Sequence, residues 1–258
     1  MSDEATIQRR ALPWPGLGAA LGPATLAVAF VVLASWSWRK WTDVQIDFGS
    51  QLYIPWQLVE GNALYRDIAH RNGPLSHYVD ALAFLLVGVS LRTLILCNLA
   101  VLAASCAMTY RLFRDACGRL TATIVCLVLL CVFGFSQYVG SANYNYVTPY
   151  QQAQTHGLAL SLAMLLAFSA YFRRRTLRWC ALAGFCLGLV LLTKAELAVP
   201  AAAAAGAGLF WGVASEPIDG RRLLGLGSAF LGAALFPVAA AFSLLALQIM
   251  KIEEPATS

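Results

Sequence analysis

The residues best suited to chemistry lie in one polar passage, DFGSQLYIPWQLVEGNALYRDIAHRNGPLSHY, at positions 47–78. Asp47 opens it, and a carboxylate can act as a general base towards a hydroxyl group if its pKa and position suit. Arg66, His70 and Arg71 follow, and arginine binds phosphate oxygens through paired hydrogen bonds. The passage thus combines a candidate base with a candidate phosphate site. Attraction to anionic headgroups explains the same basic residues equally well.

Two further polar segments follow later in the chain, at 137–156 and 191–197. The first is rich in Tyr and Asn and contains His156. Such side chains suit sugar binding by stacking and hydrogen bonding, and they suit an interfacial loop equally well. The second contains Lys194 and Glu196 at the end of an apolar run, where a surface role is as good an explanation as a functional one.

The rest of the chain is too apolar for a soluble domain. Its 258 residues are 59% hydrophobic and 12% charged, with a mean hydropathy of +0.67. Several apolar runs approach or exceed the ~20 residues that cross a bilayer core. We therefore predict an all-α, polytopic membrane protein with a single transmembrane domain over 1–258. The predicted spans are 16–38, 91–112, 120–138, 155–172, 177–193, 197–214 and 223–249.

The apolar stretch 75–88 is ambiguous, since about fourteen residues suit a re-entrant or interfacial helix better than a span. If it does not cross, eleven of the 18 basic residues share one side with the N-terminus. If it does cross, only five do, which opposes the excess of Lys and Arg in cytoplasmic loops. We therefore predict a cytoplasmic N-terminus and an outer loop over 39–90. The eleven are Arg9, Arg10, Arg111, Arg114, Arg119, Arg173, Arg174, Arg175, Arg178, Arg221 and Arg222.

The outer loop 39–90 is expected to contain helices that lie along the membrane. Leu52, Trp56 and Val59 recur at helical spacing just after Asp47, so a simple helix-capping role for this acid is the plainer alternative to catalysis. Further on, His77 and Asp80 share one face of the 75–88 helix. An acid in an apolar helix is costly unless it meets a polar partner. We expect Asp80 to pair with His77 or with an arginine.

The seven cysteines fall in or beside apolar runs and form no CxxC pair. Packing therefore explains them, and the sequence carries no zinc or haem signature. Small residues recur at four-residue spacing, for example Gly184 with Gly188. This pattern lets membrane helices approach closely, although glycine is common in such helices in any case.

The order of motifs resembles C-type glycosyltransferases that use lipid-phosphate sugars, a superfamily that includes protein mannosyltransferases and the lipid A aminoarabinose transferase. In that family an acid opens the first outer loop, followed by a Tyr, a Gly, a Pro-Leu turn and an apolar helix. The corresponding residues are Asp47, Tyr53, Gly61, Pro74 with Leu75, and LLVGVS at 85–90. The run LRWCALAGFCLGLVLLTKAEL at 177–197 is also similar to a segment of the family.

The resemblance implies an inverting transfer of a sugar from a polyprenyl-phosphate donor to a lipid or glycan acceptor at the outer face of a bacterial inner membrane. Asp47 would be the catalytic base, and Arg66, Arg71 and Lys194 the donor-phosphate ligands. The resemblance establishes no cofactor, and it leaves a divalent metal open with weak support. No nucleic-acid partner is expected. The residues expected to line the substrate site are Asp43, Tyr53, His70, Asn143, Tyr144, His156 and Glu196.

The chain departs from the family pattern at three points. Phe48 stands where relatives carry the second acid of an Asp-Glu pair, and His156 stands where many carry another acid. Family members also usually continue beyond the seventh helix, so the chain is expected to hold the shared core as a shortened module. A non-catalytic membrane scaffold and a small transporter are the alternative functions, and the mid-span regions are almost free of the charges that a transporter would need.

Overall fold

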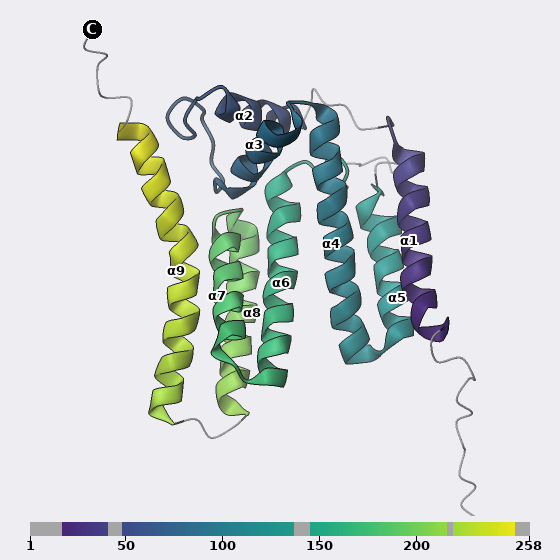
Figure 1. The fold of residues 1–258 in the computed structure, drawn as a ribbon, viewed down its shortest axis with the longest axis vertical. Helices are drawn as coiled ribbons and strands as arrows, with labels where there is room; N and C mark the ends of the chain where they lie inside the picture. Colours follow the sequence, from purple (N-terminus) through teal and green to yellow (C-terminus); the bar gives the residue numbers. More distant parts are fainter. Residues whose placement is uncertain (1–16, 41–47, 137–144, 216–218, 251–258) are drawn as a thin grey trace, which may run out of the picture.

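The computed structural model describes residues 17–40, 48–136, 145–215 and 219–250. Throughout these ranges the regular elements are helices, as the sequence predicts (Figure 1). Their bounds are α1 (Leu17–Ser37), α2 (Gly49–Val59), α3 (Leu75–Val87), α4 (Leu91–Cys117), α5 (Arg119–Val128) with the π-helical turn η2 (Leu129–Gly134), α6 (Gln152–Arg174), α7 (Leu177–Leu191), α8 (Ala195–Ala214) and α9 (Gly220–Met250).

Five of these helices, α1, α4, α6, α8 and α9, are long and apolar enough to cross a membrane. They expose large apolar side chains such as Val199, Phe210 and Phe242, as surfaces facing lipid do. The protein is therefore an all-helical membrane protein. The other two predicted spans correspond to the shorter apolar helices α5 with η2, and α7, which run beside the long helices (Figure 1). The count of seven crossings stays a prediction.

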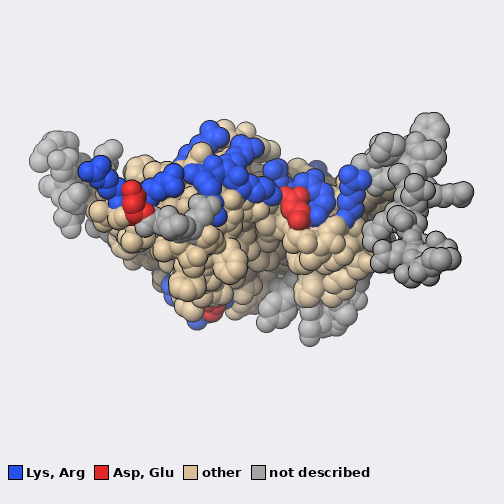
Figure 2. Space-filling view, turned by 90° about the horizontal axis from the view of Figure 1, so that it is seen from below, with Lys and Arg blue, Asp and Glu red and all other residues tan. Residues whose placement is uncertain are grey.

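The bundle has two chemically different ends. We call one the Arg end: it comprises residues 111–119, 173–178 and 219–222, where the described part of the chain carries nine arginines and two acids. Figure 2, seen from below, shows these basic side chains gathered across the lower face. The opposite end, which we call the loop end, comprises residues 39–40, 48–90, 145–151 and 192–196. Its described residues carry five Lys or Arg and four acidic side chains.

The helices α2 and α3 lie together at the loop end, above the upper ends of α6, α7 and α8 (Figure 1). Leu52 and Val59 of α2 pack against a buried cluster that contains Phe84 of α3, whereas Trp56 of the same predicted stripe is exposed. On α3, His77 and Asp80 are buried on one face with Phe84, as their spacing predicts.

The LLVGVS segment, residues 85–90, contains the last residues of α3 and the turn that leads into α4. Gly88 has a φ of +103°, a conformation that favours glycine, and the chain turns there. Ser90 then caps α4, because its side-chain oxygen accepts a hydrogen bond from the Thr93 amide at 3.1 Å. Gly118, with a φ of +93°, similarly separates α4 from α5 at the Arg end.

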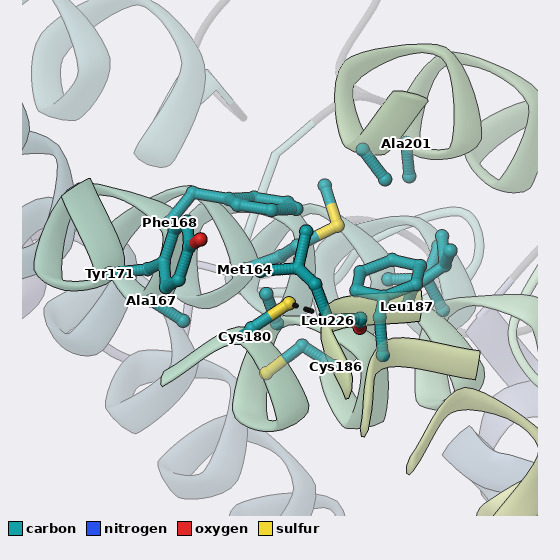
Figure 3. Packing of buried hydrophobic residues seen from close by; sticks show 13 residues of the cluster. Met164, Ala167, Phe168, Tyr171, Cys180, Cys186, Leu187, Ala201 and Leu226 are labelled. Carbon is teal, nitrogen blue, oxygen red and sulfur yellow. Dashed lines mark hydrogen bonds between the residues drawn. The ribbon is translucent and has the colours of Figure 1, made fainter. Parts of the chain in front are cut away.

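The core has two parts. One joins α1, α4, α5 and η2, and the other joins α6, α7, α8 and α9. In the second part, Phe168 and Tyr171 of α6 lie near Cys180 and Cys186 of α7 (Figure 3). Four of the seven cysteines are buried and all seven are free thiols, which agrees with a packing role.

The close approach of α7 to α9 depends on two glycines. A Cβ at Gly184 would overlap the carbonyl group of Phe230, and one at Gly188 would overlap the carbonyl group of Ala234. Both obstacles are backbone atoms of α9, which a side-chain rotation cannot move. The small-residue pattern in α7 is thus used for helix packing.

We predict that Gly188→Ala lowers the free energy of unfolding by about 1–3 kcal/mol, because α9 must move away from α7. Thermal unfolding of the detergent-solubilised protein measures the change. Gly206→Ala in α8 is the control, since a Cβ there meets no atom within 4 Å. A control that is destabilised as strongly as Gly188→Ala would contradict this account of the α7–α9 contact.

Candidate functional site

A cavity of about 470 Å³ opens at the loop end. Its walls come from the first turns of α2, from the loop before α3 and from the start of α6, with Gln51, His70, Arg71 and Gln151 among the polar lining residues. Ser50, in the first turn of α2, also lines the cavity. In the sequence, this turn begins two residues after the predicted base Asp47. Asp47 itself lies outside the described residues, as do Asp43, Asn143 and Tyr144.

The loop between α2 and α3 is held by its own side chains. Asp67 accepts hydrogen bonds from the Ala63 amide at 2.8 Å and from the Arg66 guanidinium, which together hold its pKa at about 2. Tyr65, with a φ of +69°, donates its hydroxyl proton to the Asn72 carbonyl at 2.6 Å. Arg66 is therefore engaged with Asp67 and lies outside the lining of the cavity.

The end of this loop is joined by backbone hydrogen bonds to the turn between α7 and α8. The Gly73 amide donates to the Thr193 carbonyl at 2.7 Å, and the Leu75 amide donates to the Leu192 carbonyl at 3.0 Å. Gly73 is required at this contact, because a Cβ would overlap the backbone of Leu192. The two polar segments are thereby brought side by side.

This junction places Arg71 near Lys194 and Glu196. The Lys194 ammonium lies 3.3 Å from the Glu196 carboxylate, and the positive charge of Arg71 also acts on Glu196. The Lys194 side chain is only 11% exposed, whereas that of Glu196 is 70% exposed. Lys194 and Glu196 line a second cavity of about 210 Å³, together with Asn145, Gln154 and Thr155.

A chain of buried amides fixes α2 to α4 and α6 beneath the first cavity. The Gln152 amide donates to the Gln51 side-chain oxygen at 3.2 Å, and the Gln152 side chain donates to that of Asn98 at 3.4 Å. Asn98 in turn donates to the Val147 carbonyl at 3.0 Å. These amides fix the position of the first turn of α2.

The three histidines of the chain gather beside these amides. The rings of His70 and His77 meet edge to face with 4.5 Å between their centroids, and His156 lies close enough to act on the charge of His77. Burial, with the neighbouring histidines, lowers the pKa of His77 to about 3, and burial beside Arg71 lowers the pKa of His70. Both rings are therefore neutral at pH 7.

Asp80 lies on the same buried face of α3 and makes neither an ion pair nor a hydrogen bond with any residue that the structure describes. The expected pairing with His77 or an arginine is thus wrong. Burial raises the pKa of Asp80 well above its usual value, so its carboxyl group stays protonated through a wider pH range. A neutral carboxylic acid can both donate and accept a hydrogen bond, for which buried water is the natural partner.

The predicted residues within the described chain do not all line one cavity. His70 and Arg71 line the first cavity, and Lys194 and Glu196 line the second. His156 is buried below them. Tyr53 is 53% exposed and packs on Trp56 rather than on either cavity.

Three further residues of this region, the buried amides Gln51, Asn98 and Gln152, are not among those that the sequence pattern singled out. Asn98 carried a usable signal, since a lone amide within an apolar span requires a polar partner. Among the described residues, no group of three His, Cys, Asp or Glu side chains is placed to hold a metal ion.

Comparison with known proteins finds no matching family model, no matching curated protein and no matching solved structure. The chemistry of the site therefore follows from its own residues. The site offers two cationic groups from separate segments, Arg71 and Lys194, beside cavities lined by amides. Such a combination suits a ligand that carries both a phosphate and hydroxyl groups.

The raised pKa of Asp80 predicts a pH-dependent stability. The unfolded carboxyl group titrates near its ordinary value of about 3.9. The folded state holds the proton more tightly, so stability falls as the pH rises from about 4 through the raised pKa. Asp80→Asn has no proton to lose. Its melting temperature relative to wild type should therefore increase from about pH 4 to about pH 8, as measured by thermal unfolding.

Asp67→Asn is the matched control, because the pKa of Asp67 is lowered and not raised. The stability that Asp67 contributes is present above about pH 4 and is lost as the pH falls towards about 2, so this variant should be the less stable one at neutral pH. Parallel pH profiles for wild type and Asp80→Asn would contradict the buried, unpaired state of Asp80.

Proposed function

We propose that the protein is a membrane glycosyltransferase that transfers a sugar from a polyprenyl-phosphate donor to a lipid or glycan acceptor at the loop end. The observation that carries the proposal is the junction of the 70–73 loop with the α7–α8 turn. It brings Arg71 and Lys194 from distant parts of the chain to one region, next to the start of α2.

In this proposal Asp47 accepts the proton of an acceptor hydroxyl group as its oxygen attacks the anomeric carbon of the sugar. The bond between that carbon and the phosphate oxygen breaks, and polyprenyl phosphate leaves with both electrons of the bond. Arg71 and Lys194 stabilise the charge on the leaving phosphate. Arg66 is the weaker candidate for this role because Asp67 holds its guanidinium.

The path of the lipid chain is supported by an apolar groove of about 440 Å³ between α3, α7 and α9. Pro74, Leu75 and Leu192 form part of its lining, and these residues belong to the same junction that carries Arg71 and Lys194. Exposed Phe236 and Leu244 continue it along α9. A lipid phosphate at the junction could therefore leave its chain in this groove.

We further propose that α5 with η2 and α7 also cross the membrane and that α3 does not, which makes seven crossings. The loop end then faces the outside of a bacterial inner membrane, and the Arg end faces the cytoplasm, as the excess of arginine there favours. The alternatives, a non-catalytic scaffold or a small transporter, predict no cleavage of a lipid-phosphate sugar.

Removing one phosphate ligand should weaken donor binding. A charge-assisted hydrogen bond contributes about 1.5–3 kcal/mol, so Arg71→Gln and Lys194→Gln should each weaken affinity by about 10- to 100-fold. The measurement is binding of a synthetic polyprenyl-phosphate sugar to the full chain in nanodiscs. Arg66→Gln makes the same change of charge and should weaken binding much less. Equal losses in all three variants would indicate attraction to the whole loop and not a phosphate site.

Removing the proposed base should stop transfer while donor binding is kept. Asp47→Asn retains the shape of the side chain but cannot accept the proton, so turnover should fall by about 10²–10⁴-fold. Release of polyprenyl phosphate measures turnover. Asp43→Asn is the control and should remain active. Full turnover in Asp47→Asn would exclude this residue as the base, and a wild-type chain that binds donor without turning it over would support the shortened-module interpretation.

A further inference from the structure

The Arg end contains another cavity, which the proposed transferase reaction does not use. It has a volume of about 420 Å³ and lies where the corner between α6 and α7 meets the start of α9. Arg175 lines it from the corner, and Arg221 and Arg222 line it from α9. The charged residues of the lining are these three arginines and one acid, Asp219, so the cavity has a net positive charge.

The charges of α9 are not neutralised within the part of the chain that the structure describes. Asp219 caps the helix, because its carboxylate accepts a hydrogen bond from the Arg222 backbone amide at 2.8 Å. No described carboxylate lies within ion-pair distance of the guanidinium groups of Arg221 or Arg222. Both side chains are exposed at the rim of the cavity.

The neighbouring arginines behave differently. Arg114 and Arg173 both bind Asp115, with distances of 2.7 and 2.9 Å between nitrogen and oxygen. Arg174 and Arg178 both lie over the Trp179 ring, each with its guanidinium carbon 5.5 Å from the ring centroid. The cavity therefore combines Arg221 and Arg222, which pair with no described carboxylate, with the positive charge of Arg175.

Apolar side chains adjoin this charged cavity. Leu177 and Leu226 belong to its lining, and Leu224, one turn further into α9, is 75% exposed. A ligand at this position meets arginines on one side and an exposed apolar helix surface on the other. That combination fits an amphiphile with an anionic head.

We propose that this cavity binds the phosphate headgroup of an anionic glycerophospholipid, whose acyl chains lie along the exposed apolar side of α9. The guanidinium groups of Arg221 and Arg222 hold the phosphate oxygens, and Arg175 adds positive charge from the α6–α7 corner. One lipid thereby joins α9 to the two helices that it packs against. The site is separate from the loop end and does not depend on the proposed transferase activity.

The test is native mass spectrometry of the full chain with phosphatidylglycerol, together with thermal unfolding in mixed micelles. The double variant Arg221→Gln with Arg222→Gln should weaken retention of phosphatidylglycerol by about tenfold or more and should lose the stabilisation that this lipid gives. The double variant Arg114→Gln with Arg173→Gln makes the same change of charge at arginines that Asp115 already binds. It should retain the lipid as wild type does.

Two further probes separate a lipid from other sources of the same chemistry. Phosphatidylcholine, which has no net charge, should bind much more weakly than phosphatidylglycerol. Glycerol phosphate should fail to displace the lipid at equal concentration, because it lacks the acyl chains. Equal losses in the two double variants, equal binding of phosphatidylcholine, or displacement by glycerol phosphate would each overturn the proposal.

Discussion

Two backbone hydrogen bonds, from Gly73 to Thr193 and from Leu75 to Leu192, determine the arrangement of the loop end. Each contributes only about 0.5–1.5 kcal/mol on balance, yet they decide which segments are neighbours. Without them, Arg71 would belong to a long surface loop and Lys194 to a separate helix turn. The absence of a side chain at Gly73 is what allows the two backbones to come so close.

The same region contains many polar groups that an apolar bundle must satisfy. Gln51, Asn98 and Gln152 hydrogen-bond to one another and to the backbone, whereas burial raises the pKa of Asp80 and lowers the pKa of His77, which disfavours the charged form of each. Burying an unpaired polar group costs roughly 1–3 kcal/mol, which is large beside the stability of a typical domain. A bundle without a function at this end could place apolar residues there, so the retained polarity agrees with a ligand site.

The sequence predicts the features that depend on local pattern and on composition. Spans, the helix after Asp47, the buried face of α3 and the gathering of arginines at one end all follow from periodicity and from the cost of charge in lipid. It could not predict which partners the individual polar side chains meet. Arg66 meets Asp67 and not an open site, and Asp80 meets no charged partner, because these outcomes depend on how the 62–73 loop folds and on which helices cover α3.

The contrast between the two ends also explains what each can bind. At the Arg end, Asp115 binds two of the arginines and aromatic rings lie beside others, whereas Arg221 and Arg222 of α9 line a cavity and pair with no described carboxylate. At the loop end, the cations stand beside amides and an apolar groove that borders α3, α7 and α9. The first combination suits an anionic membrane lipid, and the second suits a lipid that presents a sugar through its phosphate.

Photo-crosslinking with a polyprenyl-phosphate analogue tests the central claim most directly. The analogue carries a photoreactive group next to its phosphate, and the labelled peptides of the full chain are mapped by mass spectrometry. The account predicts labels in residues 69–78 and 189–197 that an excess of unlabelled polyprenyl-phosphate sugar removes. Labels confined to the Arg end, or labels at the loop end that the unlabelled donor does not reduce, would contradict it.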